Sequence, residues 1–169
     1  MSEIEVTVAA PDERATLENL LQLYIHDFSE HWAGRPDGEI GEDGRFAPYP
    51  LDAYWNEPDH VPLLLRAHGH PVGFALLDRT SHTGHDLDRN MREFFILRKH
   101  RRSGVGTAAA RAIFSLYPGR WEAAIARPNA AALPFWRKAV AGHPLAEDVV
   151  ESDENTPVWN GAVIRFRIR

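Results

Sequence analysis

EFFILRKHRRSGVGT, residues 93–107, is the stretch that decides the fold of this chain. An apolar run typical of a strand passes into a basic cluster and then into Gly104 and Gly106, where a helix is expected to begin. The unpaired N–H groups of a helix N-terminus carry partial positive charge, glycines admit a ligand to the backbone, and arginines add forked, charged donors. These features predict a phosphate or pyrophosphate cradle between a strand and a helix.

Other interpretations of this stretch fit less well. A P-loop needs Gly-Lys-Ser/Thr, and the chain contains no such run. Residues 104–109 match the dinucleotide pattern Gly-x-Gly-x-x-Ala, but that fingerprint follows its strand directly and needs an acidic residue about 20 positions later. Here polar, mostly basic residues intervene, and the next expected strand ends at Arg127 and Pro128. One plain alternative stays open, in which Gly104 only opens a helix and residues 98–102 are a solvated charge run.

The composition limits the class of protein. A chain of 169 residues with 44% hydrophobic and 25% charged residues predicts one ordinary globular domain. A net charge of −5 disfavours a nucleic-acid partner, and the lack of cysteine excludes disulfides, thiolate metal sites and a cysteine nucleophile. The acidic N-terminus resembles no secretory signal, and no run of 18 apolar residues occurs, so we expect a cytoplasmic protein without a membrane partner.

Hydrophobic periodicity predicts the order strand, helix, helix, three strands, helix, strand, helix, two strands. The expected strands are 3–9, 61–67, 71–78, 91–97, 121–126, 145–152 and 162–168, and the expected helices are 12–30, 51–56, 104–117 and 129–140. Residues 31–50 are expected to form a long loop of the kind that often carries function. Pro134 lacks the N–H that a helix from Asn129 would need, so this helix should begin after Ala131 or bend near Pro134.

A second motif, Asn129-x-x-Ala132-x-x-Phe135-Trp136, follows the fifth expected strand. Together with Arg101-x-x-Gly104-x-Gly106, on these elements and in this order, it resembles the GNAT N-acetyltransferase superfamily over essentially the whole chain. Segments 24–30, 93–106 and 135–138 are similar to a branch of predicted acetyltransferases of unassigned substrate. The resemblance implies a single α/β (α+β) domain over residues 1–169. Its sheet would be mixed, mostly antiparallel and seven-stranded, with four flanking helices and splayed fourth and fifth strands.

The resemblance also implies that acetyl-CoA is the acyl donor. The pyrophosphate would lie on the glycine loop, and the pantetheine arm would pair with the free edge of the fourth strand near Ile96. The implied cofactor-binding residues are Phe95, Ile96, Leu97, Arg101, Arg102, Ser103, Gly104, Val105, Gly106, Thr107, Asn129, Ala132, Phe135 and Trp136. Asn129 fits a plain helix N-cap equally well, and both interpretations stay open.

Direct transfer to an amine needs two proton steps, because an alkyl ammonium has a pKa of about 10 and the departing thiolate must be stabilised. By resemblance Glu93 is the predicted general base, and an ion pair with a nearby arginine is the alternative. The usual tyrosine acid of the family is replaced by Trp136, and indole is not an acid in water. Tyr24, Tyr49 or Tyr54 could take that role, and the sequence does not choose among them.

The end of the first helix and the loop after it usually wall the acceptor site in this family. The implied acceptor-binding residues are Tyr24, Asp27, Glu30, Tyr49 and Trp55, and His26 and His31 join Asp27 and Glu30 as second choices for the base. Acidic residues at 37, 39, 42 and 43 would suit a cationic acceptor. The pairs His68/His70 and His82/His85 have ligand-like spacings but lie at a turn and in a polar loop. We therefore expect solvated side chains and no metal site.

These observations predict a cytoplasmic N-acetyltransferase that moves an acetyl group from acetyl-CoA directly to a primary amine of a small molecule or peptide. The alternative is a catalytically silent acyl-CoA-binding or interaction module, which the missing tyrosine favours. A dinucleotide oxidoreductase ranks far below both. An exposed final strand would also permit a homodimer.

Overall fold

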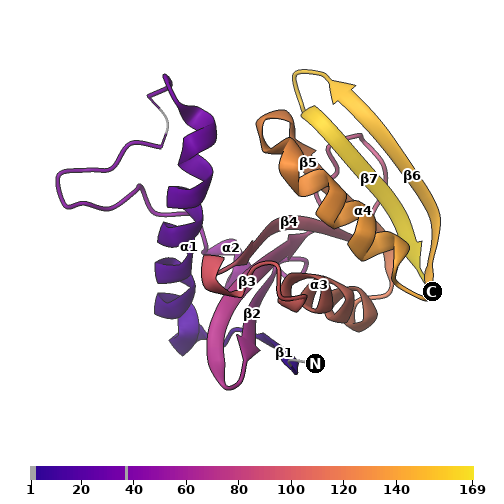
Figure 1. The fold of residues 1–169 in the computed structure, drawn as a ribbon, viewed down its shortest axis with the longest axis horizontal. Helices are drawn as coiled ribbons and strands as arrows, with labels where there is room; N and C mark the ends of the chain where they lie inside the picture. The colour runs from indigo at the N-terminus through magenta and orange to yellow at the C-terminus, as the bar shows by residue number, and fades with distance from the viewer. Residues whose placement is uncertain (1–2, 37) are drawn as a thin grey trace.

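The computed structural model describes residues 3–36 and 38–169. Within these ranges seven strands form one mixed sheet in the order β1-β2-β3-β4-β5-β7-β6 (Figure 1). The strands are β1 Ile4–Val8, β2 Val61–Ala67, β3 His70–Asp78, β4 Arg89–Ile96, β5 Gly119–Ala126, β6 Ala146–Asn155 and β7 Asn160–Ile168. Neighbouring strands are antiparallel except β4 and β5, which are parallel. The predicted fold class and element order are confirmed.

The described residues also form four α-helices: α1 Arg14–Ser29, α2 Ala53–Asn56, α3 Val105–Leu116 and α4 Leu133–Ala141. Their ends differ from the predicted ones by a few residues. The last helix begins at Leu133 after a 3-10 segment, Arg127–Ala132, in which Asn129 has non-helical angles. The expected late start is confirmed, because Pro134 is tolerated in the first turn, where its missing N–H would have no partner.

The helices cover opposite faces of the sheet (Figure 1). On one face α1 and α2 bury Leu17, Leu21 and Tyr54 against Phe74 and Phe95. On the other face α3 and α4 cover a larger apolar cluster. Its buried members include Ala109, Ile113, Phe114, Trp121, Trp136, Ala139, Val140, Ile164, Phe166 and Ile168. The sheet therefore has two distinct faces, here called the α1 face and the α3 face.

An irregularity in β4 decides which face Glu93 meets. Leu77 pairs with Met91 and Leu76 pairs with Glu93, so Arg92 is an extra residue in β4. Strand side chains alternate between faces, and one extra residue reverses the alternation. Met91 packs with the α3 face, as regular alternation would also require of Glu93. The bulge instead places Glu93 beside Leu76, which belongs to the α1 face.

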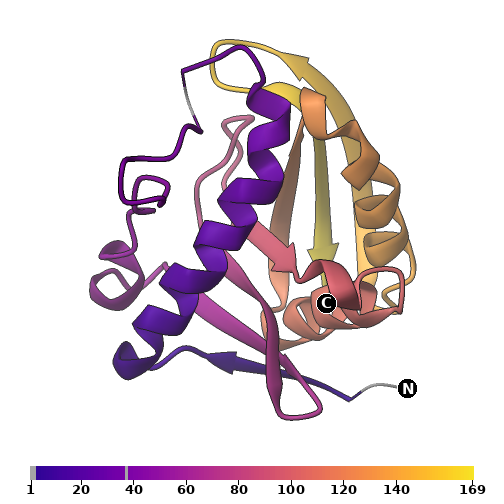
Figure 2. The same cartoon turned by 60° about the vertical axis from the view of Figure 1, so that its left-hand side comes forward.

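Strands β4 and β5 separate soon after they begin. Among the described residues they pair at Arg89 with Trp121 and at Asn90 with Glu122, and at no later position. Figure 2 shows the β5-β7-β6 half of the sheet turned away from the β1–β4 half. The predicted splay is confirmed, and it leaves the edge of β4 beyond Asn90 without a strand partner.

The final hairpin corrects one expectation. The last strand, β7, lies between β5 and β6 and is not the exposed edge, so β6 is the edge strand of this half. The inner position gives β7 ladders on both sides and turns Ile164, Phe166 and Ile168 into the α3-face cluster, while Arg165, Arg167 and Arg169 are more exposed. The inner strand β7 therefore carries the apolar row of this half of the sheet, and the mostly exposed β6 forms its edge.

Candidate active site

The glycine loop joins the end of β4 to α3. Gly104 is the N-cap residue of α3, with φ of +85°, and no side chain caps the helix there. The N–H groups of the first turn are consequently free of side-chain acceptors. A Cβ at Gly106 would lie 3.2 Å from the Phe135 ring, so glycine permits close approach of α3 to α4. The geometry fits an anion held by backbone N–H groups.

The two arginines of the loop have different surroundings. Arg101 bonds the carboxylate of Asp27 on α1, and its Nε donates to the carbonyl of Ile96 over 2.8 Å. Arg98 also pairs with Asp27, at 2.7 Å. Arg102 is exposed, has φ of +61°, and forms no hydrogen bond or ion pair with any described residue. Arg101 thus ties the loop to α1, while the guanidinium of Arg102 remains available to an anion.

The remaining predicted cofactor-binding residues of β4 and the glycine loop differ in their contacts and burial. The side chains of Phe95 and Leu97 pack on the α1 face, so their contribution to a ligand would come from the backbone. Ser103 donates to the carbonyl of His100 over 2.6 Å, Val105 is buried, and Thr107 is half-buried in the first turn of α3.

The second motif faces β4 across the splay. Asn129 is half-buried inside the 3-10 segment, and it is the N-cap of neither this segment nor α4. The ring of Phe94 lies 5.7 Å from Phe135 and 5.1 Å from Trp136, centroid to centroid. Ala132 packs against the same cluster. Trp136, only 8% exposed, therefore forms part of this wall at the position where the sequence resemblance implies a tyrosine.

Glu93 is held by two phenols on the α1 face. Tyr24 of α1 donates to one carboxylate oxygen, and Tyr49 of the long loop donates to the other over 3.0 Å. No ion pair of Glu93 occurs within residues 3–36 and 38–169, since Arg92 pairs with Asp78 at 3.5 Å. Burial raises the pKa of Glu93, and the two phenol hydrogen bonds counter that rise only in part. The carboxylate is consequently a stronger base than an exposed glutamate.

The tyrosines around Glu93 stay protonated. Burial, with the nearby charge of Glu93, raises the pKa of Tyr24 and of Tyr49 well above the ordinary phenol value. Burial and the charge of Asp78 act in the same direction on the pKa of Tyr54. All three can donate hydrogen bonds across the neutral pH range.

A cleft of about 310 Å³ lies between residues at the end of α1 and residues of the β6–β7 connection. Its lining includes Phe28, His31, Trp32, Ala126, Pro128 and Trp159. We call it the aromatic cleft. Tyr24, which bonds Glu93, lies one helical turn before Phe28, and their ring centroids are 5.6 Å apart. The cleft therefore begins one side chain away from the contacts of Glu93.

Other predicted acceptor residues are placed less directly. Asp27 forms ion pairs with Arg98 and Arg101. Glu30 and His26 are exposed. Trp55 donates its indole N–H to the carbonyl of Ala9 over 3.0 Å. Of the acidic loop residues, 39, 42 and 43 are exposed, and Asp37 lies outside the described residues.

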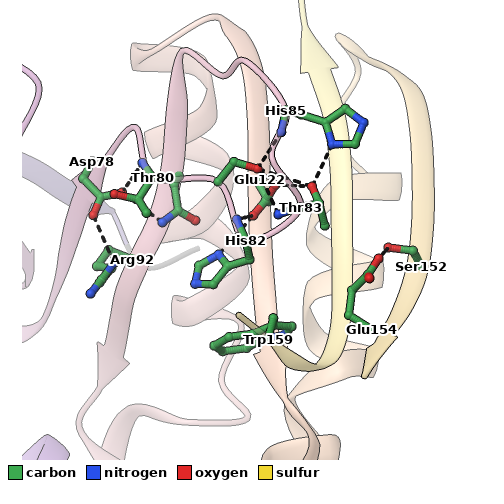
Figure 3. Close-up of polar contacts among 12 residues, drawn as sticks. Asp78, Thr80, His82, Thr83, His85, Arg92, Glu122, Ser152, Glu154 and Trp159 are labelled. Carbon is green, nitrogen blue, oxygen red and sulfur yellow. Dashed lines mark hydrogen bonds and ion pairs between the residues drawn. The ribbon is translucent and has the colours of Figure 1, made fainter. Parts of the chain in front are cut away.

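One histidine prediction is wrong. His68, His70 and His85 are exposed as expected, but the side chain of His82 is only 15% exposed and lies against Glu122 (Figure 3). Glu122 of β5 is fully buried and accepts hydrogen bonds from residues of the loop before β4. A charged residue inside the apolar strand 121–126 was the available signal, because a buried carboxylate needs donors. Sequence reasoning also missed Phe28, Trp32 and Trp159 of the cleft.

Two absences apply to the described part of the chain. There, no group of three or more His, Asp or Glu side chains is arranged to hold a metal ion. None of the helices formed by residues 3–36 and 38–169 has the length and apolar character needed to span a membrane.

Comparison with known proteins agrees with this geometry. No curated protein matches the chain. An acetyltransferase structure from Thermus thermophilus has a TM-score of 0.66 at 14% identity, with 100% of each chain covered. The aminoglycoside acetyltransferase AAC(6')-Ib in complex with coenzyme A and kanamycin has a TM-score of 0.63 at 16% identity, covering 99% of this chain and 95% of that one. The ribosomal-protein-S18-alanine N-acetyltransferase of Escherichia coli reaches 0.54 at 10% identity, over 98% and 93%.

At these identities the solved structures show a shared fold. The family follows from the sequence model of the Acetyltransferase (GNAT) family, which matches residues 17–141 and so covers the glycine loop, Glu93 and the second motif. The chain belongs to the GNAT family of acetyl-CoA-dependent N-acetyltransferases.

Proposed function

We propose that this enzyme transfers the acetyl group of acetyl-CoA directly to a primary amine of a small molecule or peptide, with Glu93 as general base. The observation that carries the proposal is the carboxylate of Glu93, held by Tyr24 and Tyr49 on the α1 face of β4 where the strand has lost its partner. Solved structures of similar fold contain amine acceptors such as kanamycin.

The space between the separated strands β4 and β5 is the proposed binding site of acetyl-CoA. Backbone groups of β4 around Ile96 would hold the pantetheine arm, and the first turn of α3 with Arg102 would hold the pyrophosphate. The lack of a side-chain cap on α3 and the left-handed φ of Gly104 support this placement. Asn129, Ala132, Phe135 and Trp136 would wall the arm on the opposite side.

The chemistry follows from the state of Glu93. A carboxylate whose pKa is raised by burial is better matched to removing a proton from nitrogen than an exposed one. The two phenols fix its orientation and can supply hydrogen bonds to charge that develops nearby. Tyr24 and Tyr49 are thus the proposed replacements for the missing tyrosine, since both already contact Glu93.

The aromatic cleft is the proposed acceptor site. Phe28, Trp32 and Trp159 offer ring faces, which suit an amine with a flat or apolar body and also attract cations. Tyr24, which bonds Glu93, contacts Phe28 of the cleft lining. The roles of Asp27, Glu30 and Trp55 in acceptor binding stay predictions.

Two further assignments belong to the same proposal. We place the reaction in the cytoplasm, because acetyl-CoA is a cytoplasmic metabolite. We also propose that a homodimer, if it forms, uses the edge of β6, where Val149 and Val150 are about half exposed. Light scattering of the purified protein measures that state.

A silent acyl-CoA-binding module is the second candidate, and the buried Trp136 at the tyrosine position favours it. One assay separates the two: acetyl-CoA with spermidine, kanamycin, 2-phenylethylamine or a peptide with a free N-terminal alanine, followed by thiol release. The chain has no cysteine, so the protein adds no thiol background. Thiol release that depends on an amine supports the transferase. Coenzyme A binding without release in any arm supports the silent module.

A further inference from the structure

Glu122 is a buried charged residue that has no role in the proposed site formed by Glu93 and the glycine loop. It is fully buried on β5 beside Asn90, at the point where β4 and β5 part. Its oxygens accept hydrogen bonds from the backbone N–H of His82 at 2.6 Å, from Ser81 at 2.8 Å and from Thr83 at 3.0 Å (Figure 3). Burial acts to raise the pKa of Glu122, but these hydrogen bonds and that of the His82 ring outweigh it and lower the pKa. Glu122 is therefore an ionised carboxylate.

The carboxylate also fixes the His82 ring. Nδ1 of His82 lies 3.0 Å from Oε1 of Glu122. Because an ionised carboxylate only accepts hydrogen bonds, Nδ1 must carry the proton. In the neutral ring Nε2 is then an unprotonated acceptor, and no described residue donates to it. A histidine oriented in this way by a carboxylate is a typical proton acceptor.

The position of the ring links it to the aromatic cleft. His82 packs against Trp159 with ring centroids 4.4 Å apart, and Trp159 lines the cleft. Along the same face of β5, Glu122 is followed by Ala124 and Ala126, both partly exposed, and Ala126 also lines the cleft. Only small side chains therefore lie between Glu122 and the cleft along this face of β5.

Anchoring of the loop does not by itself account for the imidazole. The backbone of His82 and the hydroxyls of Ser81 and Thr83 already tie the loop to Glu122. Of the other charged groups in this region, Arg165 lies opposite Glu122 in β7, and its Nε is buried without a hydrogen-bond partner among the described residues. Asp78 pairs with Arg92 on the β3–β4 side, His85 contacts Thr83, and Glu154 accepts from Ser152 on β6 (Figure 3). Glu122 is the charge in direct contact with the ring.

We propose that His82, oriented by Glu122, is a second proton acceptor of the transfer reaction, beside Trp159 of the aromatic cleft. The inference rests on the proposed function. The entering ammonium gives one proton to Nε2 of His82, and the neutral amine attacks the thioester carbonyl. The C–N bond forms, the C–S bond breaks, and its electron pair leaves on sulfur. The second nitrogen proton passes to Glu93 and on to the thiolate, while the imidazolium returns its proton to water.

The test is His82→Asn, which keeps an N–H near the place of Nδ1 and removes Nε2. With the amine that gives the fastest thiol release in the acceptor panel, kcat at pH 7 should fall by about 10²-fold. Coenzyme A affinity and the melting temperature should stay unchanged, and added imidazole should restore part of the rate. His85→Asn, in the same loop, is the matched control and should keep the wild-type rate. Wild-type kcat in a folded His82→Asn protein, across about pH 6 to 9, would overturn the proposal.

A second measurement needs neither turnover nor a variant. Nitrogen-15 NMR of the histidines in the wild-type protein should find His82 protonated at Nδ1 and bare at Nε2. Protonation at Nε2 in the neutral ring would overturn the proposal even if the variant failed to fold. Failure of every amine in the panel would contradict the proposed function instead, and the NMR result would still stand or fall on its own.

Discussion

Tyr49 donates a hydrogen bond of 3.0 Å to Glu93, although the two residues lie 44 positions apart in the chain. Tyr49 belongs to the segment between α1 and α2, and Glu93 to the bulged strand β4. The contact brings the long loop onto the α1 face, where Tyr24 completes the clamp on the carboxylate. A carboxylate held in this way has a defined orientation and a perturbed pKa, which are common features of general bases.

Glu93→Gln should separate catalysis from stability. The change keeps size, and the new amide NH2 can donate to a phenol oxygen where the carboxylate accepted from it, but basicity is lost, so kcat should fall by on the order of 10²–10⁴. The loss should shrink at high pH, where more of the amine is already neutral. Because burial raises the pKa of Glu93, the native state holds this proton more tightly than the unfolded chain. That contribution to stability is present at low pH and is lost as pH rises through the native pKa.

The variant should therefore melt at the wild-type temperature or higher at pH 7, as calorimetry can show. Tyr54→Phe, which leaves both hydrogen bonds of Glu93 in place, is the matched control for the rate. A Glu93→Gln enzyme with the wild-type rate at every pH would move the base elsewhere, with His82, Asp27 and Glu30 next to test.

Glu122→Gln should reveal the opposite pH dependence. The pKa of Glu122 is lowered by its hydrogen bonds, so its contribution to stability is present above the ordinary carboxyl pKa and is lost as pH falls through the native value. Replacing one carboxylate oxygen by an amide NH2 places a donor where the loop groups also donate. The loss of these hydrogen bonds should lower the free energy of unfolding by about 1–3 kcal/mol at pH 7. Urea unfolding at pH 7 and at pH 4 measures both effects. A variant as stable as the wild type at pH 7 would contradict the hydrogen-bond network.

Arg101 and Arg102 should behave differently when each is changed to Ala. Arg102 has no bonded partner among the described residues, so its loss should weaken coenzyme A binding by at least tenfold, for a charge-assisted contact of about 1.5–3 kcal/mol, and leave the melting temperature alone. Arg101 bonds Asp27 and the carbonyl of Ile96, so its loss should also lower the melting temperature. Titration calorimetry and thermal melts test the pair. Unchanged binding in a folded double variant would rule out the pyrophosphate assignment.

Trp159→Ala should affect the acceptor and spare the donor. The ring forms one wall of the aromatic cleft, and its loss should raise KM for the amine by about tenfold or more, as for a stacking contact of about 1–2 kcal/mol. Coenzyme A affinity should not change. Leu116→Ala, at an exposed position on α3 outside the cleft lining, is the control. An equal rise in KM for both variants would argue against a specific role of the ring.

Local rules predicted most of the fold. The positions of strands and helices follow from hydrophobic period and from breakers such as Pro134, and the glycine loop follows from the conformational freedom of Gly104. Motif order placed Glu93 on β4 and the glycine loop before α3, as the structure has them. The order of β6 and β7 in the sheet was harder to predict, because the two strands follow each other in the chain. Only the packing of the row that contains Ile164 shows which of them lies next to β5.

The sequence by itself determined the elements, their order and the glycine loop, because these depend on residues close together in the chain. Tertiary structure alone decided which side chains meet. The bulge at Arg92 turned Glu93 toward Tyr24 and Tyr49, and the end of β4–β5 pairing buried Glu122 beneath a loop that brings His82 to Trp159. The local sequence does not specify these contacts. A one-residue shift in a strand exchanges its faces, and a glutamate within an apolar strand signals a buried charge without saying which distant segments supply its donors.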